Sequence, residues 1–371
     1  MIRVGIAGIG YIAEEYIKLF SQGKIKGAEI SALSSRNYSH MKQIQDTYCL
    51  QEATLFTDYE GMLDSGTIDM VMICTPHFCH SNMAISSVER GIHTMIEKPV
   101  GVFPDELENL MNHVRLHSDT LSGVLYCKRS NPAFIKLKQL LDNGDIGDLK
   151  RITWIITDMY RPQVYFDANP WKGTFRGEGG GLMMTQVSHQ IDLLVWLCGL
   201  PVTLQAFCYT GRERKIEVEN EVTIIMEYPN NAVGQFIASS HECPGSSRLE
   251  IIGNRGQVIL ENENILTFRS LQLDEKEYSV NCKEVYGRVP YTERQFNFGS
   301  IDNTVMQAEI INNFITAIFD KTPVLCPVQE AVDTQFFIQG AYLSAWEHKK
   351  QPIPADSVTF TKELTKRIGI R

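Results

Sequence analysis

The stretch MIRVGIAGIGYIA, residues 1–13, sets a short apolar run directly before a glycine-rich turn. We expect a buried strand over Ile2–Ala7, followed at once by the motif Gly8-Ile9-Gly10-Tyr11-Ile12-Ala13, which makes a tight turn and opens a helix. The first glycine permits the turn, the second lets the backbone come close to a phosphate, and the small Ala13 lets helix and strand pack closely. The helix N-terminus adds N–H donors, so this unit predicts a dinucleotide site. The expected cofactor contacts in it are Gly8, Gly10, Tyr11 and Ile12.

Further apolar runs follow in the first 125 residues, separated by stretches with helical spacing such as Ser81–Arg90. The additional strands expected from these runs are Glu29–Ser34, Met70–Cys74, His93–Ile96 and Leu121–Leu125. Continuously apolar strands that alternate with helices are typical of a parallel sheet covered on both faces. Residues 1–125 are therefore predicted to form an α/β domain, a doubly wound parallel sheet of the Rossmann type that binds NAD(P).

The remainder of the chain, residues 126–371, changes character, because long strand-like runs are joined by turn signals. The expected strands are Leu149–Asp158, Thr203–Thr210, Glu221–Tyr228, Val233–Ser239, Leu249–Ile252 and Gln257–Leu260. Helical spacing is found at Pro132–Leu141, Met183–Cys198, Thr304–Phe319 and Val328–His348. We expect an α+β domain for substrate binding and oligomerisation, built on a large open, mostly antiparallel sheet with helices on one face. The other face is expected to be buried against a second subunit.

Composition and charge exclude several classes of protein. A chain of 371 residues with 43% hydrophobic side chains can bury the cores of about two domains. The net charge of -9 and the lack of a long basic block argue against a nucleic-acid partner. No apolar run reaches the ~20 residues that a membrane span needs, so we expect no membrane partner. The N-terminus reads as a strand and not as a signal peptide, and we expect a cytoplasmic protein.

The nine cysteines are odd in number and contain no C-x-x-C pair, so we expect reduced, mostly buried thiols. His77, Cys79 and His80 resemble metal ligands. A closed zinc site needs a fourth ligand at a matching spacing, and the sequence offers none. We therefore expect no metal.

The end of the second strand bears on the choice of cofactor. An NAD enzyme usually carries Asp or Glu there to bind the ribose 2′-hydroxyl, whereas this chain has Ser34-Ser35-Arg36. Ser35 and Arg36 offer a hydroxyl and a guanidinium, which suit a 2′-phosphate. NADP(H) is thus favoured. Arg36 stacked on adenine would suit NAD(H) as well, and that alternative stays open.

Two further segments follow predicted strands at the carboxyl edge of the first sheet. Thr75-Pro76-His77 comes after Met70–Cys74, and Glu97-Lys98-Pro99 comes after His93–Ile96. A lysine at the end of a buried strand beside a cofactor is partly desolvated and can exchange a proton with a reacting hydroxyl. Lys98 is therefore a candidate catalytic residue, although a Glu-Lys pair by itself is more often a surface ion pair.

Four segments together resemble the Gfo/Idh/MocA family, named for glucose–fructose oxidoreductase, inositol dehydrogenase and a rhizopine-catabolism protein. They are GIGYIA at 8–13, CTPHFCH at 74–80, GIHTMIEKP at 91–99 and GEGGGLMMTQVSHQIDLLVWLCG at 177–199. The resemblance implies the two-domain architecture above, assembled as dimers or tetramers. It also implies that Lys98 touches both nicotinamide and substrate and that His189 lies across the same pocket. The further cofactor contacts expected from the resemblance, in the turns over the dinucleotide, are Thr75, Pro76, His77, His80, Glu97 and Lys98.

The last of these segments also carries a polar stripe when it is read as a helix. At 100° per residue, Thr185, His189, Asp192 and Trp196 align, and an apolar face lies opposite. An exposed polar face would have the same spacing. Gly179-Gly180-Gly181 before the helix favours a site, because a glycine run lets a ligand approach the backbone. An imidazole such as His189 has a pKa suited to proton transfer near neutrality.

The chain departs from the family pattern at positions that concern the substrate. Many family dehydrogenases have Asp where this chain has Thr185, which puts inositol-type chemistry in doubt. Thr185-Gln186 resembles instead the Asn-Gln variant of relatives that act on sugars and nucleotide sugars. The segment from Tyr160 to Gly173 also resembles the corresponding segment of sugar-acting relatives. Where the family shows Arg-aromatic-x-Pro, this chain has Arg129-Ser130-Asn131-Pro132. The expected substrate contacts are Lys98, Arg129, Tyr165, Trp171, Thr185, Gln186 and His189.

The sequence thus predicts an NAD(P)-dependent dehydrogenase or reductase that acts on CH–OH groups. It would transfer a hydride between nicotinamide and an alcohol or ketone carbon of a sugar, sugar acid or nucleotide sugar. The alternatives are a trans-dihydrodiol- or inositol-type dehydrogenase and a non-catalytic, dinucleotide-sensing regulator of the same fold. Lys98 and His189 are both present, which favours an enzyme over a regulator.

Overall fold

A computed structural model describes residues 1–369 and divides them into two units, each built on its own sheet. The N-terminal unit comprises residues 1–130 and 302–335, and the C-terminal unit comprises residues 131–301 and the chain from 336 onward. The first change of unit, after Ser130, lies close to the expected boundary at residue 125. The return of 302–335 to the N-terminal unit interrupts the contiguous second domain that was expected over 126–371. Phe314 and Ile315 in the returning segment are buried. A Cβ added at Gly123 would lie 3.1 Å from the ring of Phe314, and one added at Gly27 would lie 3.4 Å from Ile315.

The sheet of the N-terminal unit is entirely parallel, with strand order β3-β2-β1-β4-β5-β6. Its strands are β1 (Ile2–Ala7), β2 (Ala28–Ser34), β3 (Thr54–Phe56), β4 (Met70–Ile73), β5 (His93–Ile96) and β6 (Ser122–Val124). Every residue of β4 is buried, as expected of a strand covered on both faces. The order reverses beside β1, so the carboxyl ends of β1 and β4 border the crevice where this type of sheet binds its ligand.

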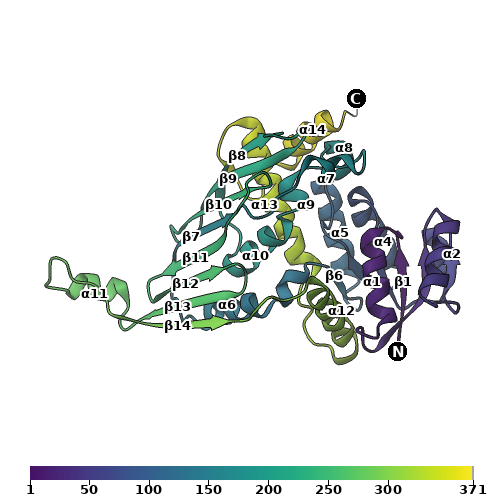
Figure 1. Cartoon of the computed structure of the whole chain (residues 1–371), viewed down its shortest axis with the longest axis horizontal. Coiled ribbons are helices and arrows are strands. Elements are labelled where there is room, and N and C mark those ends of the chain that lie inside the picture. Colours follow the sequence, from purple (N-terminus) through teal and green to yellow (C-terminus); the bar gives the residue numbers. More distant parts are fainter. Residues whose placement is uncertain (370–371) are drawn as a thin grey trace. The chain divides into compact units, whose positions relative to one another are not determined.

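Helices separate these strands in the chain (Figure 1). The side chains of Asn37 and Asp58 begin two of them by accepting the amide hydrogens of His40 and Gly61. The helices are α1 (Tyr11–Ser21), α2 (Tyr38–Thr47), α3 (Tyr59–Asp64), η1 (His77–Cys79), α4 (His80–Glu89), α5 (Pro104–Leu116), η2 (Cys127–Ser130) and α12 (Asn303–Asp320). The long helix α13 (Val328–Glu347) contributes residues to both units.

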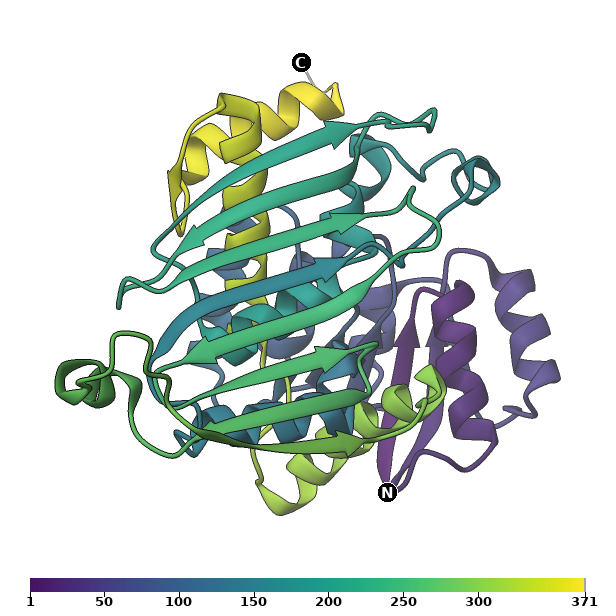
Figure 2. The same ribbon diagram turned by 60° about the vertical axis from the view of Figure 1, so that its left-hand side comes forward.

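The sheet of the C-terminal unit has nine strands in the order β14-β13-β12-β11-β7-β10-β9-β8-β15. All its pairs are antiparallel except β10 with β7. Helices cover one face of the sheet, and the other face is open (Figure 2). The strands are β7 (Leu149–Ile156), β8 (Thr203–Thr210), β9 (Glu219–Glu227), β10 (Val233–Ser239), β11 (Ser247–Gly253), β12 (Gly256–Glu261), β13 (Ile265–Leu271), β14 (Tyr291–Asn297) and β15 (Gln351–Pro352). The expected open, mostly antiparallel sheet is confirmed.

The helices of this unit differ from expectation at one important place. Two helices, α9 (Leu182–Thr185) and α10 (Ser188–Cys198), replace the single helix expected over Met183–Cys198. The amide of Val187 donates to the carbonyl of Leu182, five residues back, so the regular ladder of bonds four residues apart is interrupted. The other helices are α6 (Pro132–Asp142), α7 (Gln163–Asp167), α8 (Phe175–Glu178), α11 (Glu275–Asn281) and α14 (Ser357–Ile368).

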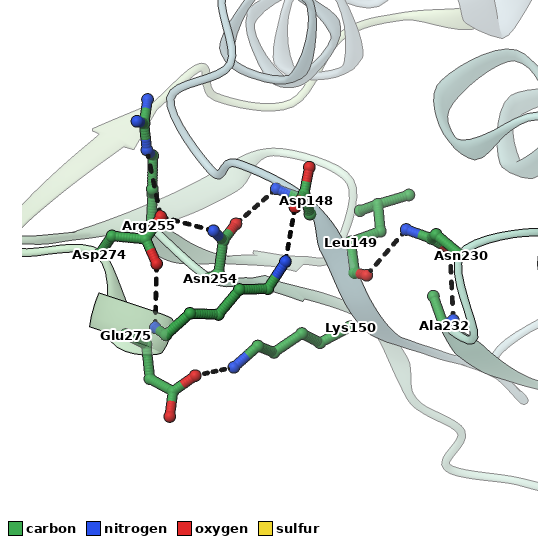
Figure 3. Close-up of polar contacts among 10 residues, drawn as sticks. Asp148, Leu149, Lys150, Asn230, Ala232, Asn254, Arg255, Asp274 and Glu275 are labelled. Carbon is green, nitrogen blue, oxygen red and sulfur yellow. Dashed lines mark hydrogen bonds and ion pairs between the residues drawn. The ribbon is translucent and has the colours of Figure 1, made fainter. Parts of the chain in front are cut away.

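An arm, residues 272–290, leaves the sheet between β13 and β14 and carries α11 away from it (Figures 1 and 2). Polar contacts tie its base to the sheet (Figure 3). The Nδ2 of Asn254 donates to Asp274 at 2.6 Å, and its Oδ1 accepts the amide hydrogen of Asp148 at 2.5 Å. Lys150 forms an ion pair with Glu275 beside them. Asn254 thus holds both the start of β7 and the start of the arm.

Four strands were missed by the sequence pattern, namely β3, β13, β14 and β15. All residues of the edge strand β14 are exposed or half-buried, so its side chains show no apolar alternation. Its register comes from backbone pairing with β13, which a pattern of side chains does not reveal. The expectation of mostly buried cysteines was also wrong: Cys74, Cys127 and Cys326 are buried, and the other six are half-buried or exposed. Within residues 1–369, no helix combines the length and apolar composition needed to cross a membrane.

Candidate active site

The turn between β1 and α1 has the geometry of a phosphate-binding loop. Gly8 has a φ of +86°, and a Cβ there would lie 2.7 Å from Thr75 Cγ2 and 2.8 Å from the carbonyl oxygen of Cys74, so only glycine fits. Nothing lies within 4 Å of a Cβ added at Gly10, and no side chain among residues 1–369 caps α1. The first turn of α1 thus begins without a capping side chain at a glycine that a ligand can approach closely, which fits the pyrophosphate of a dinucleotide.

Residues at the start of α1 and after the end of β2 lie next to this turn. Tyr11 is 81% exposed at the first position of α1, and Ile12 behind it is half-buried. The amide of Gly8 donates to the carbonyl of Ser34 at 2.9 Å, which brings the end of β2 against the turn. Ser35 is half-buried and Arg36 is exposed. The first acidic residue after β2 is Asp46, close to the end of α2, so no carboxylate at the strand end would repel a 2′-phosphate.

His80 joins the two turns that follow β4 and β5. Its ring is fully buried, with Nδ1 at 2.6 Å from the carbonyl oxygen of Pro99 and Nε2 at 2.6 Å from that of Thr75. Burial lowers the pKa of the imidazole, although both carbonyl contacts favour the protonated ring. This geometry argues against the direct cofactor contact expected of His80. The side chain instead fixes the backbone of both turns, with Thr75 and His77 half-buried and Pro76 exposed.

Glu97 and Lys98 follow β5 directly. Glu97 is buried, its Oε1 accepts the hydroxyl hydrogen of Tyr16, and its Oε2 accepts the amide hydrogen of Lys98 at 3.0 Å. Burial raises the pKa of Glu97, against the opposing effect of the Lys98 charge. Glu97 therefore anchors the backbone of Lys98, and its burial with two protein partners argues against the direct cofactor contact expected of it. No pattern in the sequence singled out Tyr16, because its partner Glu97 lies 81 residues away in the chain.

In the C-terminal unit, a buried carboxylate holds the glycine run. Glu219 accepts the amide hydrogens of Gly181 at 3.1 Å and Met183 at 2.9 Å, and the hydroxyl hydrogen of Tyr342 at 2.8 Å. A Cβ at Gly180 would lie 2.2 Å from Tyr342 Oη, and one at Gly181 would lie 2.2 Å from the carbonyl oxygen of Glu219. Gly180 and Gly181 are thus required by close packing on protein groups, whereas the sequence suggested the approach of a ligand. Burial raises the pKa of Glu219 to about 7.

The predicted polar stripe is divided by the break between α9 and α10. Thr185 ends α9, and its hydroxyl donates to the carbonyl of Gly181 at 2.8 Å. Gln186 is largely buried, and His189, in the first turn of α10, is half-buried. Asp192 is fully buried, so the expectation that it lies on a presented polar face was wrong. Tertiary packing thus buries a position that helical spacing placed on the polar side.

The helix α7 and the loop between it and α8 come close to these residues. Tyr165 Oη lies 3.4 Å from Gln186 Nε2, and Lys172 Nζ lies 3.9 Å from the centre of the Tyr165 ring. Trp171 is 48% exposed in the same loop. The C-terminal unit therefore brings Tyr165, Gln186 and Lys172 together beside the break that carries Thr185 and His189.

Arg129 is placed differently from expectation. Its side chain is fully buried, pairs with Glu330 and donates to the carbonyl of Leu325 at 3.2 Å, all within the N-terminal unit. These contacts connect η2 to the returning segment and argue against a substrate contact. Among residues 1–369, no group of three or more His, Cys, Asp or Glu side chains is arranged to hold a metal ion.

Two family models match the chain. The model for the oxidoreductase family with an NAD-binding Rossmann fold matches residues 2–123, and the GFO/IDH/MocA C-terminal domain model matches residues 134–259. The chain belongs to the Gfo/Idh/MocA oxidoreductase family. The predicted family, the NAD-binding Rossmann domain and the prediction of an oxidoreductase are thereby confirmed.

Members and structural neighbours of this family are distant in sequence. The chain is 26% identical to the uncharacterized oxidoreductase YrbE of Bacillus subtilis over 271 residues, which are 72% of this chain and 75% of the relative. The WlbA dehydrogenase from Bordetella pertussis, in complex with NADH and UDP-GlcNAcA, has a TM-score of 0.77 at 22% identity over 96% of this chain and 99% of that one. Levoglucosan dehydrogenase in complex with NADH has a TM-score of 0.78 at 17% identity, over 96% and 100%. At these identities the structures establish the shared fold.

Proposed function

We propose that this Gfo/Idh/MocA oxidoreductase transfers a hydride between nicotinamide and a CH–OH carbon of a sugar, sugar acid or nucleotide sugar. The observation that carries the proposal is Lys98 at the carboxyl end of β5. Its backbone is held by Glu97, and the next residue, Pro99, is held by His80. Because β1 and β5 are parallel strands of one sheet, this lysine stands at the same edge as the turn at Gly8–Gly10.

The chemistry assigned to the residues is general acid–base catalysis. A bound dinucleotide supplies the hydride acceptor or donor at its nicotinamide ring. Lys98 takes the proton of the substrate hydroxyl during oxidation and returns it during reduction. His189 serves as the second proton-transfer group or as a relay to Lys98. Its half-buried position on α10 supports this role, because a side chain carried by a helix is placed more precisely than one on a loop.

Sugar-type substrates are supported by the C-terminal unit. Tyr165, Trp171, Thr185 and Gln186 offer hydroxyl, amide and aromatic groups that bind polyols, and Tyr165 and Gln186 are already in contact. The solved neighbours are described as complexes with UDP-GlcNAcA and with levoglucosan, both of which are carbohydrates. Thr185 stands where many family dehydrogenases have Asp, so we rank inositol-type substrates lower.

For the cofactor we propose a preference for NADP(H), with NAD(H) as the alternative. Ser35 and Arg36 at the end of β2 are accessible, and no carboxylate stands there. The hydroxyl of Ser35, the guanidinium of Arg36 and the lack of a carboxylate after the strand all favour binding of a 2′-phosphate. The structural neighbours, in contrast, are described with NADH. The choice therefore depends on what Arg36 contacts, the 2′-phosphate or the adenine ring.

We also propose a cytoplasmic homo-oligomer, a dimer or tetramer. All nine cysteines are free thiols, which favours a reducing compartment. The open face of the nine-stranded sheet carries Phe207, Ile225 and Val233, each of them about half exposed. An apolar face of this kind is stabilised when a second subunit covers it.

A substrate screen tests the function. The full chain is incubated with NADP⁺ or NAD⁺ and with neutral sugars, sugar acids, nucleotide sugars, inositols and trans-dihydrodiols, and the absorbance of the reduced nicotinamide is followed. We expect turnover in one of the three sugar classes. Turnover confined to inositols or dihydrodiols would contradict the proposed substrate class. Binding of the dinucleotide without turnover on any substrate would favour the regulator instead.

A further inference from the structure

Positive charge is concentrated on two segments of the C-terminal unit, residues 159–176 and 211–217. Together they contain six Lys or Arg side chains and three acidic ones, in a chain whose net charge is -9. The segments are joined by backbone and side-chain bonds. Arg214 Nε donates to the carbonyl of Arg161 at 2.7 Å, and the amide of Glu217 donates to the carbonyl of Gly173 at 2.8 Å. These hydrogen bonds hold the two positively charged segments next to each other.

Three of these cations rest on the rings of Tyr160 and Tyr165, and a fourth, Arg212, rests on the ring of Tyr209. Lys172 Nζ lies 3.9 Å and Arg161 Cζ lies 5.2 Å from the centre of the Tyr165 ring. Arg214 Cζ lies 5.3 Å from the centre of the Tyr160 ring. We call Tyr160, Arg161, Tyr165, Lys172 and Arg214 the cation–aromatic cluster. A ring face attracts a cation but leaves its charge uncompensated, so the cluster keeps its positive potential.

The acidic side chains nearby do not neutralise the cluster. Within residues 1–369, no carboxylate forms an ion pair with Arg161, Lys172 or Arg214. The acidic Glu221 pairs instead with Arg212 at 3.2 Å and with His241. The buried Glu178 accepts the amide hydrogen of Gly173 at 2.6 Å. By comparison, Arg3, Arg90, Arg248 and Arg269 elsewhere in the chain have carboxylate partners.

The cluster adjoins the residues to which we assign substrate binding. Tyr165, which carries both Lys172 and Arg161 on its ring, reaches Gln186 with its hydroxyl at 3.4 Å. Gln186 lies between Thr185 at the end of α9 and the start of α10. We propose that the cation–aromatic cluster is a subsite for an anionic group of the substrate, the carboxylate of a sugar acid or the phosphate of a phosphorylated sugar. This inference rests on the proposed function and narrows its substrate class to anionic sugars.

The test compares three probes that share one sugar ring. D-glucose is neutral, D-glucuronate carries a carboxylate and D-glucose 6-phosphate carries a phosphate. Binding of each to the full chain loaded with NADP⁺ is measured by calorimetry at low ionic strength, and turnover is measured in parallel. We expect at least one anionic probe to bind tenfold or more tightly than D-glucose, with a preference that weakens as salt is added. The two anionic arms distinguish a carboxylate site from a phosphate site.

Variants assign the preference to the cluster. Lys172→Met and Arg161→Gln should each weaken the anionic probe by about ten- to a hundredfold, because each removes a charge-assisted hydrogen bond. D-glucose should change by less than about threefold on the same grounds. Lys172→Arg should retain most of the preference. Lys283→Met on the exposed arm is the matched control and should leave all three affinities unchanged. Melting temperatures and NADP⁺ affinity show whether each variant is folded.

The outcomes separate this inference from the proposed function. Equal affinities for the three probes, or an anion preference that survives in both Lys172→Met and Arg161→Gln, would overturn the subsite. Turnover of neutral sugars in that case would leave the dehydrogenase intact. Conversely, anion binding that depends on the cluster, without turnover of any sugar, would support the subsite and count against the enzymatic function.

Discussion

Lys98 is the residue on which the proposed chemistry depends most directly. Its backbone is held by Glu97, so substitution of the side chain should leave the turn after β5 in place. We expect Lys98→Met to lower kcat by about 10²- to 10⁴-fold, the contribution of a positioned proton-transfer group, while NADP(H) affinity stays nearly constant. Steady-state kinetics and fluorescence titration of the cofactor measure the two effects.

Substitution of His189 tests whether this residue acts together with Lys98. If Lys98 and His189 act as one unit, His189→Ala should cause a similar loss in kcat, and the double variant should lose little more than either single one. Fully additive losses would mean independent roles. Near-normal kcat in Lys98→Met would show that the assignment to Lys98 is wrong.

Arg36 decides the choice of cofactor. A charge-assisted hydrogen bond to the 2′-phosphate is worth about 1.5–3 kcal/mol, so Arg36→Ala should weaken NADP binding by roughly ten- to a hundredfold. NAD has only a hydroxyl at that position and should lose far less, which makes it the internal control. Calorimetric titration of both cofactors measures the difference. An equal loss for both would mean that Arg36 only stacks on adenine, and tighter binding of NAD by the unmodified chain would contradict the proposed preference.

Glu219 should make stability depend on pH. Burial raises its pKa from its ordinary value to about 7 in the folded chain, so between those two values the folded state holds a proton that the unfolded state has lost. The stability linked to this proton is complete below the unfolded pKa and is lost as pH rises to about 7. The melting temperature relative to that of Glu219→Gln should therefore fall between about pH 5 and pH 8. Glu217→Gln, at an exposed position, is the control. If the melting temperatures of the unmodified chain and of Glu219→Gln change in parallel with pH, the linkage is disproved.

At the scale of elements, Asn254 joins β7, the β11–β12 turn and the arm. Asn254→Ala leaves the amide of Asp148 and the carboxylate of Asp274 without this partner (Figure 3). The expected loss is about 1–3 kcal/mol in the free energy of unfolding, at about 0.5–1.5 kcal/mol for each of the two hydrogen bonds removed. Asn230→Ala is the matched control, because Asn230 is exposed and water can replace its bond to Leu149. Urea denaturation compares the two, and equal losses would contradict the role given to Asn254.

At the scale of the whole molecule, the open sheet face predicts self-association. Ile225 is 50% exposed there and lies across from Gln205 and Gln235 on the neighbouring strands. Ile225→Glu would put a charge into a buried interface and should convert the oligomer to a monomer. Val358→Glu, on the exposed side of α14, is the control for an added charge and should leave the oligomer intact. Sedimentation at micromolar concentration distinguishes the cases, and a monomeric unmodified chain would contradict the prediction.

The sequence by itself determined the glycine turn, the parallel sheet of the N-terminal unit and most of the antiparallel sheet, because each depends on local spacing and apolar period. It also located Lys98, since a short motif follows a recognisable strand. Only the tertiary structure decided that Asp192, Arg129 and His80 are enclosed, and that Tyr16 and Glu219 hold the two candidate site segments. The physical reason is that burial and hydrogen bonding at these positions come from partners far away in the chain. A one-dimensional pattern records which side chain stands at a position, and packing decides what that side chain meets.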